Sequence, residues 1–307
     1  HTSVAMMRAL VARGHTLRVA RQADLYVMEG DVRVSATPIA LVPAADPHGH
    51  DWWTESEAAD APLTAFDAVL MRKDPPFDIE YLYSTHMLER AEAQGARVFN
   101  SGASIRNHPE KLSIAEFPHL TVPTLVTRSM SRIKAFHQLY QDVIVKPLDG
   151  MGGTGIFRLR HDELNLNAIL ETLTNYGQSS IMAQRFIPEI TQGDKRILII
   201  GGEPVPFCLA RIPAAGETRG NLAAGGRGVA QPLSEKDWEI ARELGPTLAA
   251  RGLLLVGLDV IGEYVTEINV TSPTTFAEIT EQTGFDVGAM FAQALEAAVA
   301  VPGRATH

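Results

Sequence analysis

In the first hundred residues, hydrophobic positions recur in some segments at the spacing of a helix and in others at the spacing of a strand. Near the start, Val4, Met7 and Val11 share one face of a predicted helix, which Ser3 caps and Gly14 ends. Because a helix of this kind usually follows a strand, we expect a strand ahead of the printed sequence.

Shorter patterns follow in the order strand, hairpin, strand, helix and strand. They lie at 15–20, at 25–36, within 66–78, at 79–95 and at 96–100. The hairpin is predicted to turn at Glu29–Asp31. This alternation predicts an α/β domain with parallel strand pairing.

Residues 43–62 are mostly polar and are predicted to form a loop. The loop contains His48 and His50, which could suggest a metal site. No further ligands accompany them, so we interpret both as solvated side chains.

The pattern changes within 104–117, and from there the strands come in hairpins with helices between them. Hairpins are predicted at 142–160, 194–212 and 253–274, a strand leading into a linker at 181–190, and helices at 234–252 and at the C-terminus. No internal repeat is visible. We place domain boundaries after residues 109 and 189, which gives domains 1–109, 110–189 and 190–307.

Composition narrows the class of protein. The 307 residues are 45% hydrophobic and 21% charged, as in an ordinary soluble globular protein, and the net charge of −9 disfavours a nucleic-acid surface. No apolar run approaches the ~18 residues that span a bilayer. The single cysteine, Cys208, cannot form an intramolecular disulfide, which suits a reducing cytoplasm. In its apolar run it is interpreted as a buried, inert thiol rather than a nucleophile.

A glycine-rich stretch, DGMGGTG at 149–155, has the spacing of a dinucleotide fingerprint at Gly150, Gly152 and Gly155. A strand is predicted on each side, so no helix N-terminus follows to receive a pyrophosphate, and no Gly-Lys-Ser/Thr completes a Walker loop. The protein kinase motifs His-Arg-Asp and Asp-Phe-Gly are also missing from the sequence. The stretch is either a cover for phosphates at a hairpin tip or a flexible turn.

Lys146 lies on the predicted strand just before this loop. A lysine in an apolar strand is costly to bury unless an anion meets it. The side chain therefore either faces a phosphate or points to solvent.

Hard oxygen ligands occur near the C-terminus. Glu267 and Asn269 are two apart on a predicted strand, so both point to one face, and such oxygens suit magnesium. A three-residue turn at 262–264 would place Asp259 across from Glu267, whereas a two-residue turn would place it across from Thr266. We expect the three-residue turn; the alternative is the polar outer face of a hairpin.

Five strings in the order MRKDPPFD, KPLDGMGG, ARIPAAGETRGNLAAGGRG, VGLDVIG and TEINVTSPT resemble bacterial glutathione synthetases of the ATP-grasp superfamily. The resemblance extends from His1 to about Val299. It implies an N-terminal α/β substrate domain followed by an ATP-grasp fold of two α+β subdomains that clasp ATP.

The family joins γ-glutamylcysteine to glycine through an acyl phosphate made from ATP, with Mg²⁺ or Mn²⁺. The matching positions are, for the nucleotide, Lys111, Lys146, Gly150, Gly152, Gly153, Gln184 and Asp194; for the reacting centre, Arg196, Arg211 and Arg219; for the metal, Asp259, Glu267 and Asn269; and for the peptide, Arg72, Arg219, Asn221, Ser272, Pro273 and Thr274. The resemblance also implies a homotetramer, with no nucleic-acid or membrane partner.

The chain departs from its family in two places. The family's first strand is not in the sequence, and Thr275 stands where some relatives carry Cys, which we expect to be harmless. We also expect residues 216–228, with Arg219, Asn221 and Arg227, to form a lid over the acyl phosphate. The alternatives to this function are another ATP-grasp carboxylate–amine ligase and a non-catalytic ATP-binding protein; the metal ligands disfavour the second.

Overall fold

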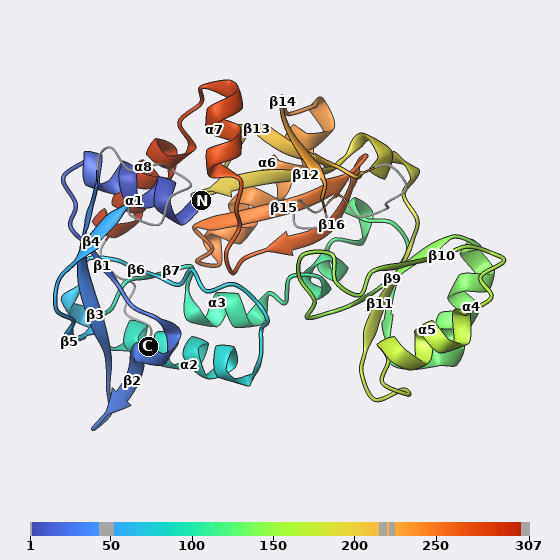
Figure 1. Cartoon of the computed structure of the whole chain (residues 1–307), viewed down its shortest axis with the longest axis horizontal. Helices are drawn as coiled ribbons and strands as arrows, with labels where there is room; N and C mark the ends of the chain where they lie inside the picture. The colour runs from blue at the N-terminus through green and yellow to red at the C-terminus, as the bar shows by residue number, and fades with distance from the viewer. Residues whose placement is uncertain (1, 43–51, 215–219, 221–224, 302–307) are drawn as a thin grey trace.

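The computed structural model describes residues 2–42, 52–214, 220 and 225–301, and three sheets of four or five strands with covering helices make up most of it (Figure 1). Short 3₁₀ helices occur at Gln22–Asp24, Leu63–Ala65, Leu112–Glu116, Pro118–Leu120 and Pro188–Gln192. No helix in these ranges is long and apolar enough to cross a membrane.

The N-terminal region is built around one long strand, β3, to which four others pair antiparallel. Its elements are β1 (Leu17–Val19), β2 (Leu25–Met28), β3 (Asp31–Leu41), β4 (Trp53–Glu55), β5 (Ala59–Pro62), β6 (Val69–Leu70), α2 (Ile79–Ala93), β7 (Val98–Phe99) and α3 (Gly102–Asn107). The predicted parallel pairing holds only for β6 with β7. The predicted loop at 43–62 contains β4 and β5, while His48 and His50 lie outside the described residues.

Helix α1 (Thr2–Ala12) buries a different face from the one expected. Thr2, Met6 and Leu10 are buried, whereas Val11 is 40% exposed. Ser3 lies inside the helix and does not cap it. The helix packs on α8 (Val287–Ala300), and its buried face joins the core of the C-terminal sheet.

The central sheet has the strand order β10-β9-β11-β8. Its elements are β8 (Thr124–Thr127), α4 (Met130–Tyr140), β9 (Val143–Pro147), β10 (Phe157–Leu159), α5 (Leu166–Leu173) and β11 (Ile181–Arg185). β9 and β10 form the predicted hairpin. The helices α4 and α5 cover one face of this sheet (Figure 1). Apolar side chains pack between the helices and that face, and the other face of β9 and β11 lines a cavity.

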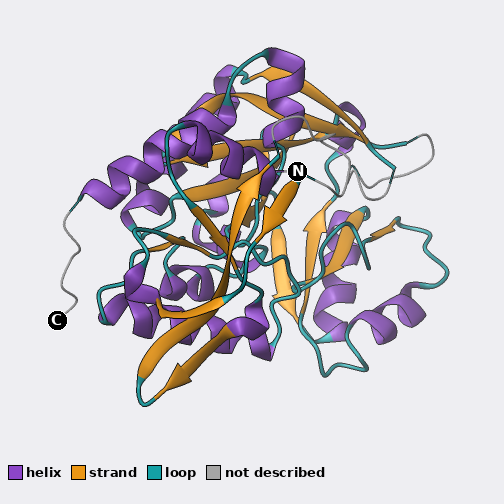
Figure 2. Cartoon of the chain, turned by 60° about the vertical axis from the view of Figure 1, so that its left-hand side comes forward, coloured by secondary structure: helices purple, strands orange, loops and turns teal. Residues whose placement is uncertain are grey.

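The C-terminal sheet, in the order β14-β13-β12-β15-β16, is covered on both faces. Its elements are β12 (Asp194–Ile200), β13 (Glu203–Ile212), β14 (Arg227–Pro232), α6 (Glu235–Ala250), β15 (Leu255–Ile261), β16 (Tyr264–Asn269) and α7 (Phe276–Thr283). Helices lie on both sides of this sheet (Figure 2). Along β12, Ile197 and Ile199 belong to the core on the α6 side, and Leu198 and Ile200 belong to the core with α1, α7 and α8. Cys208 lies in this core, where burial and, less strongly, Asp237 raise the pKa of its thiol to about 11, so it is inert as predicted.

The β15–β16 hairpin reaches the predicted side-chain pairing by a different route. Its turn has two residues, because Ile261 pairs with Tyr264 and not with Val265. The register then shifts at Thr266, and Asp259 still lies opposite Glu267. The predicted three-residue turn was wrong, but the predicted pairing of Asp259 with Glu267 is confirmed, because the bulge at Thr266 adds the extra residue instead.

Asn100, directly after β7, ties the N-terminal region to the C-terminal sheet. Its amide nitrogen donates to the carbonyls of Leu255 and Val270, both at 2.8 Å, and its oxygen accepts from the Leu255 N–H at 2.9 Å. Asn100 is 6% exposed, so water cannot take over these hydrogen bonds if its amide group is removed.

We therefore predict that Asn100→Leu, which keeps the shape but removes all three hydrogen bonds, lowers the free energy of unfolding by about 3 kcal/mol. Urea unfolding of the purified protein measures this. Asn107→Leu, at an exposed position near the end of α3, is the matched control and should change stability little. Equal stabilities of the two variants would contradict the role given to Asn100.

Candidate functional site

A cavity of about 390 Å³ lies between the open face of the central sheet and the C-terminal sheet. It brings together most of the predicted site residues: Lys111, Lys146, Gly150, Gly152, Gly153, Gln184, Asp194, Arg196, Arg211, Asp259, Glu267, Asn269, Ser272 and Thr274. Arg72 and Pro273 do not line it, and Arg219 and Asn221 lie outside the described residues.

Four buried charges form a network on the floor of the cavity. The Arg196 guanidinium donates to both Asp259 oxygens, at 2.5 and 3.2 Å, and Arg211 bridges Asp259 at 2.9 Å and Asp194 at 2.6 Å. The strand register causes this, because Arg196 lies opposite Asp259, and Asp194 opposite Arg211. Gly257 leaves the space for Arg196, since a Cβ there would come within 2.8 Å of its Cδ.

The network sets the charges of its members. Burial would raise the pKa of Asp259, but Arg196 and Arg211 hold it well below its usual range. Burial opposes the charge on Arg211, but Asp194 and Asp259 raise its pKa above the usual value. Asp194, through burial and despite Arg211, has its pKa raised to about 6, and one of its oxygens has no hydrogen-bond partner. Asp259 and Arg211 are therefore charged at neutral pH.

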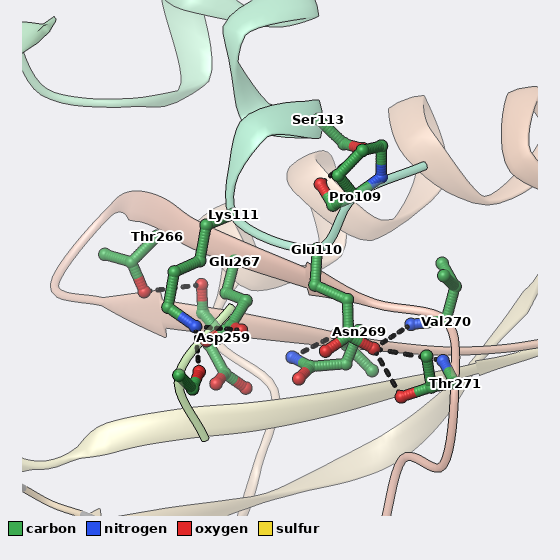
Figure 3. Close-up of polar contacts among 12 residues, drawn as sticks. Pro109, Glu110, Lys111, Ser113, Asp259, Thr266, Glu267, Asn269, Val270 and Thr271 are labelled. Carbon is green, nitrogen blue, oxygen red and sulfur yellow. Dashed lines mark hydrogen bonds and ion pairs between the residues drawn. The ribbon is translucent and has the colours of Figure 1, made fainter. Parts of the chain in front are cut away.

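Lys111 joins the glycine loop to strand β16. Its Nζ donates to the Gly150 carbonyl at 2.5 Å and to Glu267 Oε1 at 3.1 Å (Figure 3). The side chain is only 7% exposed. The loop itself runs from strand to strand, as predicted, and Gly152 and Gly153 adopt the left-handed backbone that favours glycine, with φ of 63° and 82°.

Glu110 was missed by the sequence reasoning. One of its carboxylate oxygens accepts from the backbone of Val270 and Thr271 and from the Thr271 hydroxyl, at 2.7–3.0 Å, and its own carbonyl accepts from Ile268 N (Figure 3). Burial and the nearby charge of Glu267 raise the pKa of this carboxyl. The only sequence signal was an acidic residue directly before Lys111. Glu110 fixes the end of β16 relative to Lys111.

Lys146 is a buried cation that lies on β9, is 7% exposed and lines the cavity. Its ammonium group makes no hydrogen bond or ion pair with the described residues. Burial lowers the pKa of its ammonium group, against the attraction of Glu267. Of the two interpretations of this lysine, the structure favours the one in which it faces the cavity rather than open solvent.

The oxygens of Glu267 and Asn269 fit a hard divalent cation. The Asn269 amide nitrogen donates to the Gly257 carbonyl at 3.0 Å, which leaves its oxygen for another partner. Glu267 has one oxygen on Lys111, whereas both Asp259 oxygens are held by arginines. Within the described ranges no three His, Cys, Asp or Glu side chains are grouped as a metal site, so a cation held by Glu267 and Asn269 would need water or substrate oxygens as further ligands.

The remaining predicted residues surround this centre. Gln184, on β11, donates to the Thr124 hydroxyl at 3.0 Å. Ser272 donates to Asp74, which also lines the cavity. Arg72 donates to the Pro273 carbonyl at 2.8 Å, and its burial lowers its pKa to about 10. Arg72 therefore supports the backbone of residues 272–274 without lining the cavity itself.

Thr275 is strained and unsatisfied. Its φ is 87°, which is unusual for a β-branched residue, and its buried hydroxyl has no hydrogen-bond partner in the described part of the chain. It lines the cavity at the start of α7. Backbone strain of this kind is concentrated at functional sites.

The sequence matches known protein families over most of its length. Residues 1–106 match the N-terminal domain, and residues 110–284 the ATP-grasp domain, of prokaryotic glutathione synthetase. The chain is 74% identical over 298 residues to glutathione synthetase of Bordetella parapertussis, which covers 97% of the chain and 94% of that relative. It is 58% identical to glutathione synthetase of Ralstonia nicotianae, over 97% of the chain and 90% of the relative.

Solved structures show the same fold at low identity. The ATP-grasp ligase PsnB with a minimal precursor superposes with a TM-score of 0.60 at 19% identity, covering 96% of this chain and 93% of that one. The D-cycloserine synthetase DcsG does so with a TM-score of 0.60 at 17% identity, covering 77% and 85%. The sheets and the cavity between them are thus those of an ATP-grasp ligase, and the chain belongs to the prokaryotic glutathione synthetase family.

Proposed function

We propose that this cavity joins γ-glutamylcysteine to glycine, with ATP converted to ADP and phosphate, by means of the residues described above. Family membership makes the chain an ATP-dependent glutathione-forming ligase. The observation that carries the residue assignment is the unpartnered, buried Lys146, which faces the same cavity as the oxygens of Glu267 and Asn269. A buried cation beside hard oxygen ligands is the arrangement that a metal–phosphate group requires.

The nucleotide is assigned to the side of the cavity formed by the central sheet. Lys111 and Lys146 neutralise phosphates, the loop with Gly150, Gly152 and Gly153 covers them, and Gln184 and Asp194 lie toward the nucleoside. The support is positional, since all of these residues line the cavity. The unpaired oxygen of Asp194 suits a ribose hydroxyl, which would supply the missing donor.

Glu267 and Asn269 would hold Mg²⁺ or Mn²⁺, with Asp259 beside them. A cation held there would supply positive charge that offsets the charge of the phosphates. Because Asp259 already balances Arg196 and Arg211, its role is to fix these arginines over the reacting phosphoryl group.

The chemistry follows from the weakness of a carboxylate as an acceptor. The cysteinyl carboxylate attacks the γ-phosphorus of ATP, which forms an acyl phosphate and releases ADP. The glycine amine then attacks the acyl carbon, phosphate leaves with the electrons of the C–O bond, and the amine loses a proton. The chain positions the reactants and neutralises charge, chiefly through Arg196 and Arg211. Arg219 is assigned with them from the resemblance alone.

The peptide is assigned to the segment Ser272–Thr274, which Arg72 and Glu110 hold in place. Arg219 and Asn221 are assigned to the same substrate by resemblance. They belong to the expected lid at 216–228, most of which lies outside the described residues; Gly220 is described and packs against Arg211. We further propose a cytoplasmic location, supported by the single, free Cys208, and a homotetramer, supported by the resemblance alone.

Substrate-dependent ADP formation tests the function. We expect glutathione and ADP in equal amounts only when γ-glutamylcysteine, glycine and ATP are all present. Ligation of D-alanine, or of glutamate to a peptide, with greater kcat/KM would instead indicate another carboxylate–amine ligase.

Glu267→Gln should lower kcat by about 100-fold or more and leave the melting temperature nearly unchanged, because a metal-neutralising charge is lost without a change of shape. Steady-state kinetics at several magnesium concentrations measure this. Glu263→Gln, in the exposed turn of the same hairpin, is the control. Near-normal turnover of Glu267→Gln at saturating magnesium would refute the metal assignment.

Lys146→Met should raise the KM for ATP about tenfold or more and leave the ligand-free protein as stable as, or more stable than, wild type. The reason is that an unpaired buried ammonium costs stability until a phosphate arrives. Calorimetry and ATP kinetics check the two effects, with Lys134→Met on α4 as control. A large fall in melting temperature with unchanged ATP kinetics would identify Lys146 as a structural lysine.

A further inference from the structure

Lys111 holds two groups that a nucleotide complex must use. Its Nζ is 3.1 Å from Glu267 Oε1, on the carboxylate assigned to the metal, and 2.5 Å from the carbonyl of Gly150, at the start of the glycine loop. The lysine side chain is 7% exposed and that of Glu267 is 19% exposed, so water screens the ion pair weakly.

We propose that Lys111 is an internal counter-ion, which keeps a divalent cation off Glu267 until a nucleotide phosphate takes its ammonium group. The proposal rests on the assignment of Glu267 and Asn269 to the metal in the proposed function.

The charges around the site carry the argument. Both oxygens of Asp259 are bound to Arg196 and Arg211, and Lys111 binds Glu267, so each carboxylate of the Asp259–Glu267 pair is neutralised by the chain itself. A divalent cation that enters alone meets a carboxylate whose charge is already balanced, with an ammonium group 3.1 Å away. Repulsion from this ammonium weakens cation binding in a poorly screened site.

A nucleotide changes the balance. Its phosphates bring several negative charges and attract Lys111 as well as the unpaired Lys146, which lies in the same cavity. When the Lys111 ammonium moves to a phosphate, Glu267 is freed for the cation, and the Gly150 carbonyl is released from its hydrogen bond. Cation binding, phosphate binding and release of the glycine loop are therefore linked through one side chain.

Glu110 makes this exchange local. Its carboxylate and carbonyl are fixed to Ile268, Val270 and Thr271, so the backbone at Lys111 is held against β16. Only the lysine side chain has to move, because the main chain that carries it is anchored.

Binding of Mn²⁺ to the nucleotide-free protein tests the proposal, since it needs no turnover. Electron paramagnetic resonance of free Mn²⁺ at pH 7 gives the affinity. We expect Lys111→Met to bind Mn²⁺ about tenfold more tightly than wild type, although it removes a residue assigned to ATP. Lys111→Arg keeps the charge and should bind as weakly as wild type.

Three comparisons make the result specific. Lys236→Met, on α6 with a side chain 40% exposed, removes the same charge away from the cavity and should leave the affinity unchanged. Lys111→Met combined with Glu267→Gln should lose the gain. Lys111→Gln, which can still donate to Gly150, should show the gain with less disturbance of the fold and replaces Lys111→Met if that variant melts early.

The proposal is overturned if neither neutral variant binds Mn²⁺ more tightly than wild type, if Lys236→Met gives the same gain, or if the double variant keeps it. Failure of the wild type to form glutathione would refute the proposed function instead. The activity assay that measures this is independent of the Mn²⁺ titration.

Discussion

The site depends on one carboxylate, Asp259, that two buried arginines share. Arg196 and Arg211 come from neighbouring strands, and the sheet register brings their guanidinium groups to the same carboxylate. Removing one partner from such a buried set costs about 3–5 kcal/mol, because the remaining charges lose their compensation. The arginines are thus fixed before any substrate arrives, and that fixed positive charge is what a phosphoryl transfer needs.

Two further constraints complete the cavity. The bulge at Thr266 brings Glu267 opposite Asp259, and Glu110 clamps the end of β16 to the turn that carries Lys111. Lys146 approaches from the other sheet and is left without a partner among the described residues. In the proposed function these charges meet between two sheets because a nucleotide and a peptide carboxylate react there.

Much of this arrangement could be predicted from local patterns. Strands on both sides of the glycine loop excluded a dinucleotide fold, and the spacing of Glu267 and Asn269 placed both on one face. The buried face of α1 was wrong because a partner distant in sequence, α8, selects Met6 and Leu10. β4 and β5 were missed because their residues are mostly exposed and pair only at an edge of β3. The bulge at Thr266 and the hydrogen bonds of Glu110 to Val270 and Thr271 depend on how distant segments pack, so the spacing of residues along the chain does not predict them.

In the proposed function, Lys111 and Lys146 bind phosphate when the nucleotide and metal enter, and Lys111 leaves Glu267. A crystal structure of the protein with Mg²⁺ and ADP or a non-hydrolysable ATP analogue measures this directly. We predict that Lys111 Nζ lies about 3 Å from a phosphate oxygen, that Glu267 binds the cation, and that the Lys111–Glu267 pair is broken, while Arg196 stays on Asp259. A complex in which Lys111 still contacts Glu267, with the cation bound elsewhere, would contradict the account.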